Sequence, residues 1–209
     1  MDSLKRRLGL VIVLSGPSGA GKTTVYRQLL EQRADVEFSV SCTTRPPRTG
    51  ETDGRDYHFI SREDFLLRRD QAAFLEHAEV HANYYGTLRE EVERRIAAGV
   101  SVLLDVDVQG ARAIRKAVAD TPLAAHTIFI FTAPPSVDLL EFRLRKRDTD
   151  SEAVIQTRLS NAREELTAWR EYDYFLVNDG VKEAVRDFSA IIDGALQKTS
   201  QWLSTPWEK

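Results

Sequence analysis

A glycine-rich loop directly after a buried apolar run is the feature that most limits how this chain can fold. The run Leu10–Leu14 contains only leucine, valine and isoleucine, and apolar residues at helical spacing follow over Thr23–Glu31. Between them lies a segment that matches G-x-x-x-x-G-K-[ST], namely Gly16-Pro17-Ser18-Gly19-Ala20-Gly21-Lys22-Thr23. A strand, this loop and a helix in that order predict backbone N–H groups that surround phosphate oxygens.

The last two residues of the loop carry the predicted chemistry. Lys22 is placed to reach the terminal phosphates of a nucleotide, and Thr23 offers a hydroxyl group to Mg²⁺, which bridges the β and γ oxygens. The alternative is a glycine-rich turn with a lysine by chance. The strand pattern before the loop and the helical pattern after it disfavour that alternative.

Further apolar runs without alternation are typical of parallel strands covered on both faces. They lie at Leu10–Leu14, Val100–Val106, Thr127–Phe131 and Tyr174–Val177, with Phe38–Ser41 as a fifth. Helical patterns fall at Thr23–Glu31, Leu88–Ala98, Gln109–Val118, Val137–Arg145, Glu152–Glu171 and Val181–Leu203. The alternation predicts an α/β fold in which a P-loop core has a parallel sheet covered by helices.

Composition excludes several classes of protein. The 209 residues include 29 Lys+Arg and 32 Asp+Glu, a net charge of −3, so no polybasic surface for a nucleic acid polymer or a membrane organises the chain. Cys42 is the single cysteine and there are four histidines, which argues against a disulfide or a structural zinc site. The apolar run Leu10–Leu14 is too short for a signal peptide or a membrane span, so we expect a cytoplasmic protein.

Two regions interrupt the strand and helix alternation. The first, about Thr43–Tyr85, is rich in Arg, Gly, Pro and aromatic residues and indicates short strands, clearest at Asp56–Ile60 and Phe74–His81. The second, Arg143–Arg158, surrounds an acidic stretch with basic residues and is a candidate lid. We therefore expect core segments 1–41, 89–141 and 160–209, a small mixed α/β insertion at 42–88 and a helical lid at 142–159, within one unit spanning 8–190.

Two arginines in the insertion indicate a second anion site. Arg45 and Arg48 lie three residues apart on a segment that two prolines make extended, so both could reach one phosphate. Tyr57 and Tyr85 could each add a hydroxyl group. The alternative, a solvated loop, is weakened by the aromatic residues and by the phosphate loop earlier in the chain.

Two acids, Asp105 and Asp107, lie at the end of the apolar run that begins at Val100. A carboxylate at the end of a strand beside a phosphate loop is typical of the acid on the metal side of such a site. Asp105 is therefore predicted to act on the metal or the substrate, and Asp107 to support it. Both could also cap the helix expected from Gln109, and the two interpretations are compatible.

The ordered set of motifs resembles the guanylate kinase family, a group of nucleoside monophosphate kinases within the P-loop NTPases. It covers about residues 8 to 180. The matching elements are Gly16–Thr23, Ser41–Phe59 (S-x-T-T-R-x-P-R-x-G-E-x-x-G-x-D-Y-x-F), Glu76, Asn83–Thr87, Leu104–Gly110 and Ala133–Ser136. Two departures are Asp148 where the family usually has glycine, and Cys42 where serine is common.

The resemblance implies an enzyme that transfers the γ-phosphoryl group of ATP to GMP, and to dGMP, with Mg²⁺ as cofactor. It implies that the insertion is the GMP-binding part and that GMP is bound by Ser41, Arg45, Arg48, Tyr57, Glu76, Tyr85, Thr87 and Asp105. It implies that ATP is bound by Gly16, Pro17, Ser18, Gly19, Ala20, Gly21, Lys22, Thr23 and Asn178. Implied catalytic residues are Lys22, Arg45, Arg143, Arg147 and Arg158, and the implied metal contacts are Thr23 and, through water, Asp107.

The chemistry of guanine agrees with the implied role of Glu76. The pairing edge of guanine displays two donors that one carboxylate can accept, whereas adenine places an acceptor at N1 and has no amine at C2. A surface acid on an edge strand is the alternative for Glu76. Two other functions stay open at this point: a non-catalytic binding module of the same fold, and a kinase for another small phosphorylated molecule. The sequence does not indicate an oligomeric state.

Overall fold

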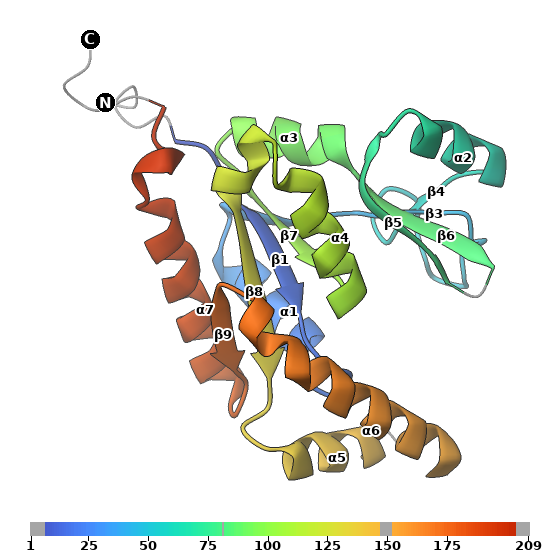
Figure 1. Cartoon of the computed structure of the whole chain (residues 1–209), viewed down its shortest axis with the longest axis vertical. Coiled ribbons are helices and arrows are strands. Elements are labelled where there is room, and N and C mark those ends of the chain that lie inside the picture. The colour runs from blue at the N-terminus through green and yellow to red at the C-terminus, as the bar shows by residue number, and fades with distance from the viewer. Residues whose placement is uncertain (1–6, 81, 147–151, 204–209) are drawn as a thin grey trace.

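A parallel sheet with helices on both faces forms the centre of the molecule, and two projections extend from one side of it (Figure 1). The computed structural model describes residues 7–80, 82–146 and 152–203. The strand order is β2-β7-β1-β8-β9 and all neighbouring strands are parallel. The strands are β1 Val11–Ser15, β2 Val36–Phe38, β7 Ser101–Asp105, β8 Thr127–Ala133 and β9 Tyr174–Val177.

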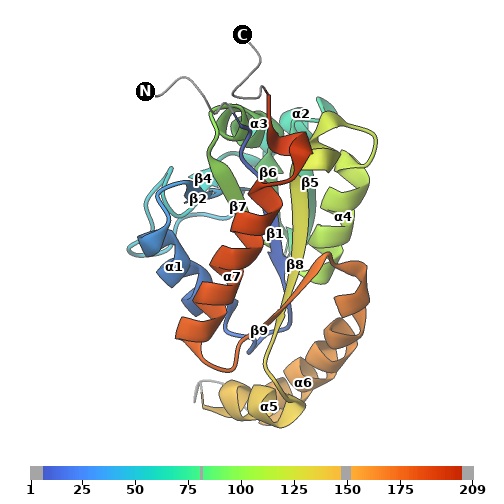
Figure 2. The same ribbon diagram turned by 90° about the vertical axis from the view of Figure 1, so that its left-hand side faces the viewer.

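Alternate residues of the first strand point to opposite faces of the sheet, and helices bury both faces. Ile12 and Leu14 pack with α1 (Lys22–Gln32) and α7 (Val181–Leu196), which lie in front of the sheet in Figure 2. Val11 and Val13 pack with α3 (Arg89–Ala97) and α4 (Val108–Val118) on the other face. The predicted α/β fold with a parallel sheet covered by helices is confirmed.

The predicted positions of four of the core strands and of the helices are confirmed to within a few residues, with three corrections. The fifth strand is Val36–Phe38 rather than Phe38–Ser41, because Val36 is the buried residue that pairs with Ser101 of β7. The helix expected over Glu152–Glu171 ends at Leu166 and continues as a 3₁₀ turn, and α7 ends at Leu196 rather than Leu203. Further 3₁₀ turns lie at Pro122–His126 and Thr199–Gln201.

A second, mixed sheet is built from the segment between Cys42 and Leu88. Its strand order is β4-β3-β6-β5, with β3 Cys42–Thr43, β4 His58–Phe59, β5 Phe74–Val80 and β6 Asn83–Leu88. The sequence analysis missed α2 (Arg62–Asp70), which begins after Ser61 and buries Phe65 between the rings of Phe74 and Tyr84. Ser61 caps this helix by accepting a hydrogen bond from the Asp64 amide, which is a local signal that the sequence does contain.

The second projection is a pair of helices, α5 (Val137–Arg145) and α6 (Glu152–Leu166). Leu140 and Leu144 of α5 form a small core with residues of α6 such as Leu159. Arg147 and Asp148, which belong to the predicted lid, lie outside the described residues. Among the residues that the structure describes, no helix is long and apolar enough to cross a membrane.

Candidate active site

The loop Gly16–Thr23 lies between β1 and α1 and takes backbone conformations that require glycine. Gly16 has a φ of 144°, and a Cβ atom there would lie 2.0 Å from the carbonyl oxygen of Thr132. Gly21 has a φ of 83°, and a Cβ atom there would lie 2.4 Å from the side-chain nitrogen of Asn178. Only a glycine lets the loop pass this close to its neighbours without strain.

Lys22 is folded over its own loop. Its Nζ donates a hydrogen bond of 2.7 Å to the carbonyl oxygen of Gly16 and lies 3.8 Å from Oδ1 of Asp105. The loop, both strand-end acids and Glu165 of α6 line a cavity of about 390 Å³. The structure therefore brings together the predicted Lys22, Thr23, Asp105 and Asp107 around one space.

The two strand-end acids have different surroundings. Burial raises the pKa of Asp105, and the nearby Lys22 opposes that rise. Asp107 is the N-cap of α4 and accepts a hydrogen bond of 2.7 Å from the Gly110 amide, so the capping interpretation is confirmed for Asp107. One oxygen of Asp107 is used in this way, and the residue still lines the cavity of the loop.

Asn178, which the resemblance implies in ATP binding, lies behind the loop and is 2% exposed. Its Nδ2 donates to the carbonyl oxygen of Ala20 at 2.8 Å, and its Oδ1 has no hydrogen-bond partner among the described residues. Nη2 of Arg143 donates to the carbonyl oxygens of Asn178 and Asp179 at 3.0 and 3.3 Å. Asn178 thus supports the loop from behind, and Arg143 connects α5 to the backbone of Asn178 and Asp179.

The predicted phosphate-binding residues of the insertion also come together. The guanidinium of Arg45 lies 5.5 Å from the ring centroid of Tyr57, and the rings of Tyr57 and Tyr85 are 6.0 Å apart. Arg45 also lies 5.9 Å from the ring centroid of Phe59. Arg48 lies on the same turn, where its amide donates to Glu51 at 2.7 Å.

Glu51, to which the sequence analysis gave no role, holds Arg45 in place. Nη2 of Arg45 donates to both carboxylate oxygens of Glu51, at 2.8 and 2.9 Å. This ion pair raises the pKa of Arg45 and, together with the Arg48 amide, lowers that of Glu51. The carboxylate therefore occupies the same donors of Arg45 that a phosphate group would use.

Of the predicted GMP-binding residues Ser41, Glu76 and Thr87, two are joined. Glu76 of β5 pairs with Thr87 of β6, and Oγ1 of Thr87 donates to Oε1 of Glu76 at 2.9 Å. Burial raises the pKa of Glu76, and Asp107 raises it further while Thr87 lowers it. Ser41 precedes β3, and its carbonyl oxygen accepts from the His58 amide; the described residues show no hydrogen bond between Ser41 and Glu76.

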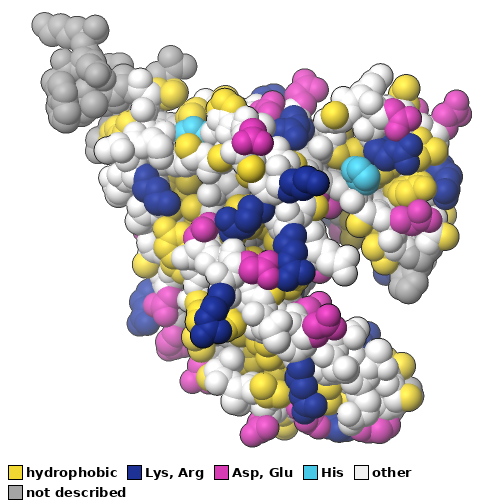
Figure 3. Space-filling model, in the orientation of Figure 1, with side chains coloured by type: hydrophobic (Ala, Val, Ile, Leu, Met, Phe, Trp, Pro, Cys, Tyr) yellow, Lys and Arg dark blue, Asp and Glu magenta, His cyan; other side chains and the backbone are white. Residues whose placement is uncertain are grey.

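The remaining predicted arginines lie on the helical projection. Arg158 is half-buried on α6, and Arg147 lies outside the described residues. Arg145 pairs with Glu141 and Glu152 on the solvated face of this projection. The surface is hollowed between the insertion and the projection of α5 and α6 (Figure 3), so these two parts face each other across an open cleft.

The structure has a P-loop on a parallel α/β sheet, and beside it a mixed insertion that brings together arginines, tyrosines and the half-buried carboxylate of Glu76. This arrangement defines a P-loop nucleotide kinase. The chain belongs to the guanylate kinase family, whose model, "Guanylate kinase", matches residues 9–195. The predictions of this family and of a phosphotransferase enzyme are confirmed. The two alternatives, a non-catalytic module and a kinase for another small phosphate, are not favoured.

Curated relatives and a solved structure agree with this membership. The guanylate kinase of Agrobacterium fabrum is 47% identical over 186 residues, which cover 89% of this chain and 82% of that protein. That of Thermotoga maritima is 45% identical over 193 residues, 92% of this chain and 90% of that protein. The crystal structure of guanylate kinase from Anaplasma phagocytophilum is similar with a TM-score of 0.73 and 34% identity, covering 97% of this chain and 94% of that one.

Proposed function

We propose that the chain transfers the γ-phosphoryl group of ATP to GMP, giving ADP and GDP, and that the residues gathered above perform this reaction. The observation that carries the proposal is the closeness of the two sites. β5, which carries Glu76, packs against α4, and Asp107 at the start of α4 lines the cavity of the phosphate loop. An acceptor bound at Glu76 therefore lies beside a donor bound at the loop.

On the donor side, the loop residues Gly16–Thr23 bind the phosphates of ATP. Their amides and the start of α1 attract negative charge, and Lys22 adds a positive charge that can leave Gly16 for a phosphate oxygen. Asn178 keeps this loop in shape through Ala20.

On the acceptor side, segment 42–88 binds GMP, and also dGMP. Arg45, Arg48, Tyr57 and Tyr85 hold its phosphate, which replaces Glu51 on Arg45. Glu76 accepts from the guanine ring, with Thr87 and Ser41 beside it and Asp105 between the two substrates. The attacking oxygen belongs to an already anionic phosphate, so no side chain has to remove a proton first.

The arginines supply the charge stabilisation that phosphoryl transfer needs. We assign segment 142–159 as a lid that brings Arg143, Arg147 and Arg158 to the transferred group, with Lys22 and Arg45 as the other cationic catalytic residues. Closure of the lid also excludes water that would otherwise hydrolyse ATP.

The residues at the loop suit Mg²⁺, which is held in such sites by one or two protein oxygens together with substrate phosphates rather than by a complete protein cage. Among the described residues no cluster of three or more His, Cys, Asp or Glu could hold a metal ion alone. The hydroxyl group of Thr23 and, through water, the carboxylate of Asp107 would hold Mg²⁺ here, and the ion would neutralise charge on the phosphates of ATP.

A coupled assay of ADP formation against GMP, AMP, CMP and UMP tests the proposal. We expect turnover with GMP to exceed that with the other three by at least about two orders of magnitude, because each of the other bases leaves a buried polar group unpaired. Binding of GMP without turnover would favour the non-catalytic module, and a better acceptor among the other three would favour a different kinase.

A further inference from the structure

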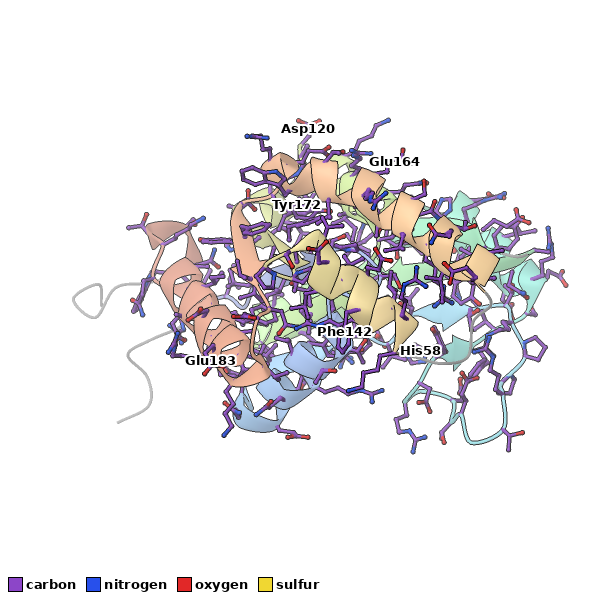
Figure 4. The ribbon with its side chains drawn as sticks, turned by 90° about the horizontal axis from the view of Figure 1, so that it is seen from below. His58, Asp120, Phe142, Glu164, Tyr172 and Glu183 are labelled. Atoms are coloured by element: carbon purple, nitrogen blue, oxygen red, sulfur yellow. The ribbon has the colours of Figure 1, made fainter. Side chains whose placement is uncertain are left out.

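The mixed sheet of the insertion carries a histidine on the face opposite to the predicted phosphate-binding residues. Tyr57 and His58 are neighbours in the chain, and successive residues of an extended chain point to opposite faces of a sheet. The ring of Tyr57 lies on the face that carries Arg45 and Tyr85. His58 of β4 therefore lies on the other face (Figure 4), in register with the buried Cys42 of β3.

His58 faces the first turn of α3, a helix that packs on the core sheet. Its Nε2 lies 3.5 Å from Oε1 of Glu91. The two side chains are 29% and 25% exposed, but the Nε2 atom is buried and no hydrogen bond within the described residues satisfies it. The attraction of the carboxylate is therefore the interaction that can offset the loss of water at Nε2.

The pair of His58 and Glu91 connects the insertion to the core. The amide of His58 donates to the carbonyl oxygen of Ser41 at 2.9 Å, so this residue also holds the chain that enters β3. On the core side, Oε2 of Glu91 lies 3.9 Å from Nη2 of Arg95. Nη1 of Arg95 donates to the carbonyl oxygen of Phe38 in β2 at 3.4 Å. A chain of contacts thus runs from the back of the mixed sheet to the edge strand of the core sheet.

The other ionisable groups around the pair come from the elements packed beside it. They are Cys42 of β3, Arg68 of α2, Arg95 of α3 and Asp53 of the loop before β4. Burial raises the pKa of Cys42 to about 11, so its thiol stays uncharged at neutral pH. Carboxylate and guanidinium groups keep their charge between about pH 6 and about pH 8, whereas an imidazole gains a positive charge as the pH falls through this range. The attraction within the pair therefore grows as the pH falls.

We propose that His58 and Glu91 are positioning residues for GMP, because their ion pair holds β4 against α3 from behind and so fixes Tyr57 on the front face. The guanidinium of Arg45 lies against the ring of Tyr57, so the place of Arg45 depends on the same support. Neither member of the pair lies on the face that binds the phosphate, and both act through Tyr57. The inference rests on the proposed binding of GMP by segment 42–88.

Three variants test the pair: His58→Gln, Glu91→Gln and the two together. Each single variant removes one partner's charge with little change of volume. The matched control is Glu90→Gln, which removes the neighbouring charge from the same first turn of α3, where Glu90 is exposed. The measurements are kcat and the KM values for GMP and for ATP, at about pH 6 and about pH 8 and at low ionic strength.

At about pH 6 we expect each single variant to raise the KM for GMP about threefold, and the double variant to raise it no further. The KM for ATP and kcat should stay within about twofold of wild type in every variant. At about pH 8 the ratio of the KM for GMP in E91Q to that in wild type should return toward one, because the imidazole has lost its charge. The phosphate of GMP titrates alike with both proteins and cancels in this ratio. E90Q should match wild type at both pH values.

A KM ratio that is the same at both pH values would show that packing rather than charge is responsible, and it would overturn the proposal. So would a double variant whose loss is the product of the two single losses. Equal losses for GMP and ATP would assign the pair to general stability of the fold, which also contradicts the inference. If wild type itself does not use GMP, the proposed function fails. Normal use of GMP by wild type with an unchanged KM in both single variants overturns this inference alone.

Discussion

Substitution of Glu76 by glutamine separates the charge of this side chain from its shape. In the structure one oxygen of Glu76 accepts from Thr87 at 2.9 Å, and glutamine can keep that bond through its own oxygen. The other oxygen becomes an NH₂ group, which would face the N–H donors of guanine. A hydrogen bond to a charged group contributes about 1.5–3 kcal/mol, and an unpaired buried donor costs a further 1–3 kcal/mol or so.

The expected loss for GMP is therefore about 3 kcal/mol, which is on the order of 100-fold in kcat/KM. AMP should gain, because the new NH₂ group can donate to N1 of adenine. The ratio of kcat/KM for GMP to that for AMP thus falls by more than the loss for GMP alone. The assay is the coupled measurement of ADP formation with each nucleotide.

The same substitution should stabilise the nucleotide-free protein. Burial raises the pKa of Glu76 above its ordinary 4.5, so the folded state holds the proton more tightly than the unfolded state does. The ionised carboxylate at neutral pH is therefore destabilising. We expect E76Q to have a higher Tm than wild type at pH 7, and this difference to diminish as the pH falls toward 4.5 and below.

Glu79→Gln is the control, because Glu79 is exposed on the same strand. It should change neither the GMP to AMP ratio nor the Tm. An unchanged ratio in E76Q would remove Glu76 from recognition of the base. A lower Tm in E76Q at pH 7 would show that the carboxylate stabilises the fold and would refute the argument from burial.

Three further substitutions test other parts of the site. Lys22→Ala should lower turnover by at least about 10³-fold with little change in urea unfolding, and a rate near that of wild type would contradict the assignment of the loop. Arg45→Met should raise KM for GMP on the order of 100-fold and leave KM for ATP within about twofold; equal losses would indicate misfolding. Gly16→Ala should cost more than about 2 kcal/mol in urea unfolding because its Cβ meets Thr132, whereas the control Gly194→Ala, with open space in α7, should gain about 0.5–1 kcal/mol.

The parts of this site that the sequence predicts best are those whose chemistry lies in one continuous segment. The conformation of Gly16–Thr23 can be predicted from the sequence alone, because the strand, the glycine-rich turn and the helix are adjacent in the chain. The buried strands are equally local, since a run without alternation indicates burial on both faces. Phe38–Ser41 was misplaced because a three-residue edge strand depends on its partner, β7, more than on its own residues.

The contacts between segments far apart in the chain could not be predicted from local rules. Thr87 reaches Glu76 through the register of β5 and β6, which includes an irregularity between Phe74 and Glu76 that no local pattern indicates. The role of Thr87 was predicted only from the resemblance to a family. Glu165 lies in no motif, and only the fold shows that it lines the cavity of the phosphate loop.

The charges of the cleft differ from what the basic residues alone suggest. Lys22 lies 3.8 Å from Asp105, and Arg45 is held by the carboxylate of Glu51. A set of unpaired cations held close together would repel one another and destabilise the nucleotide-free protein. Each carboxylate removes that repulsion but must be displaced by a phosphate. Binding of a nucleotide therefore exchanges one anion for another. Its net free energy is the difference between the interaction of the phosphate and that of the carboxylate with the same donors. It is smaller than the full attraction of a phosphate to the arginines and the lysine.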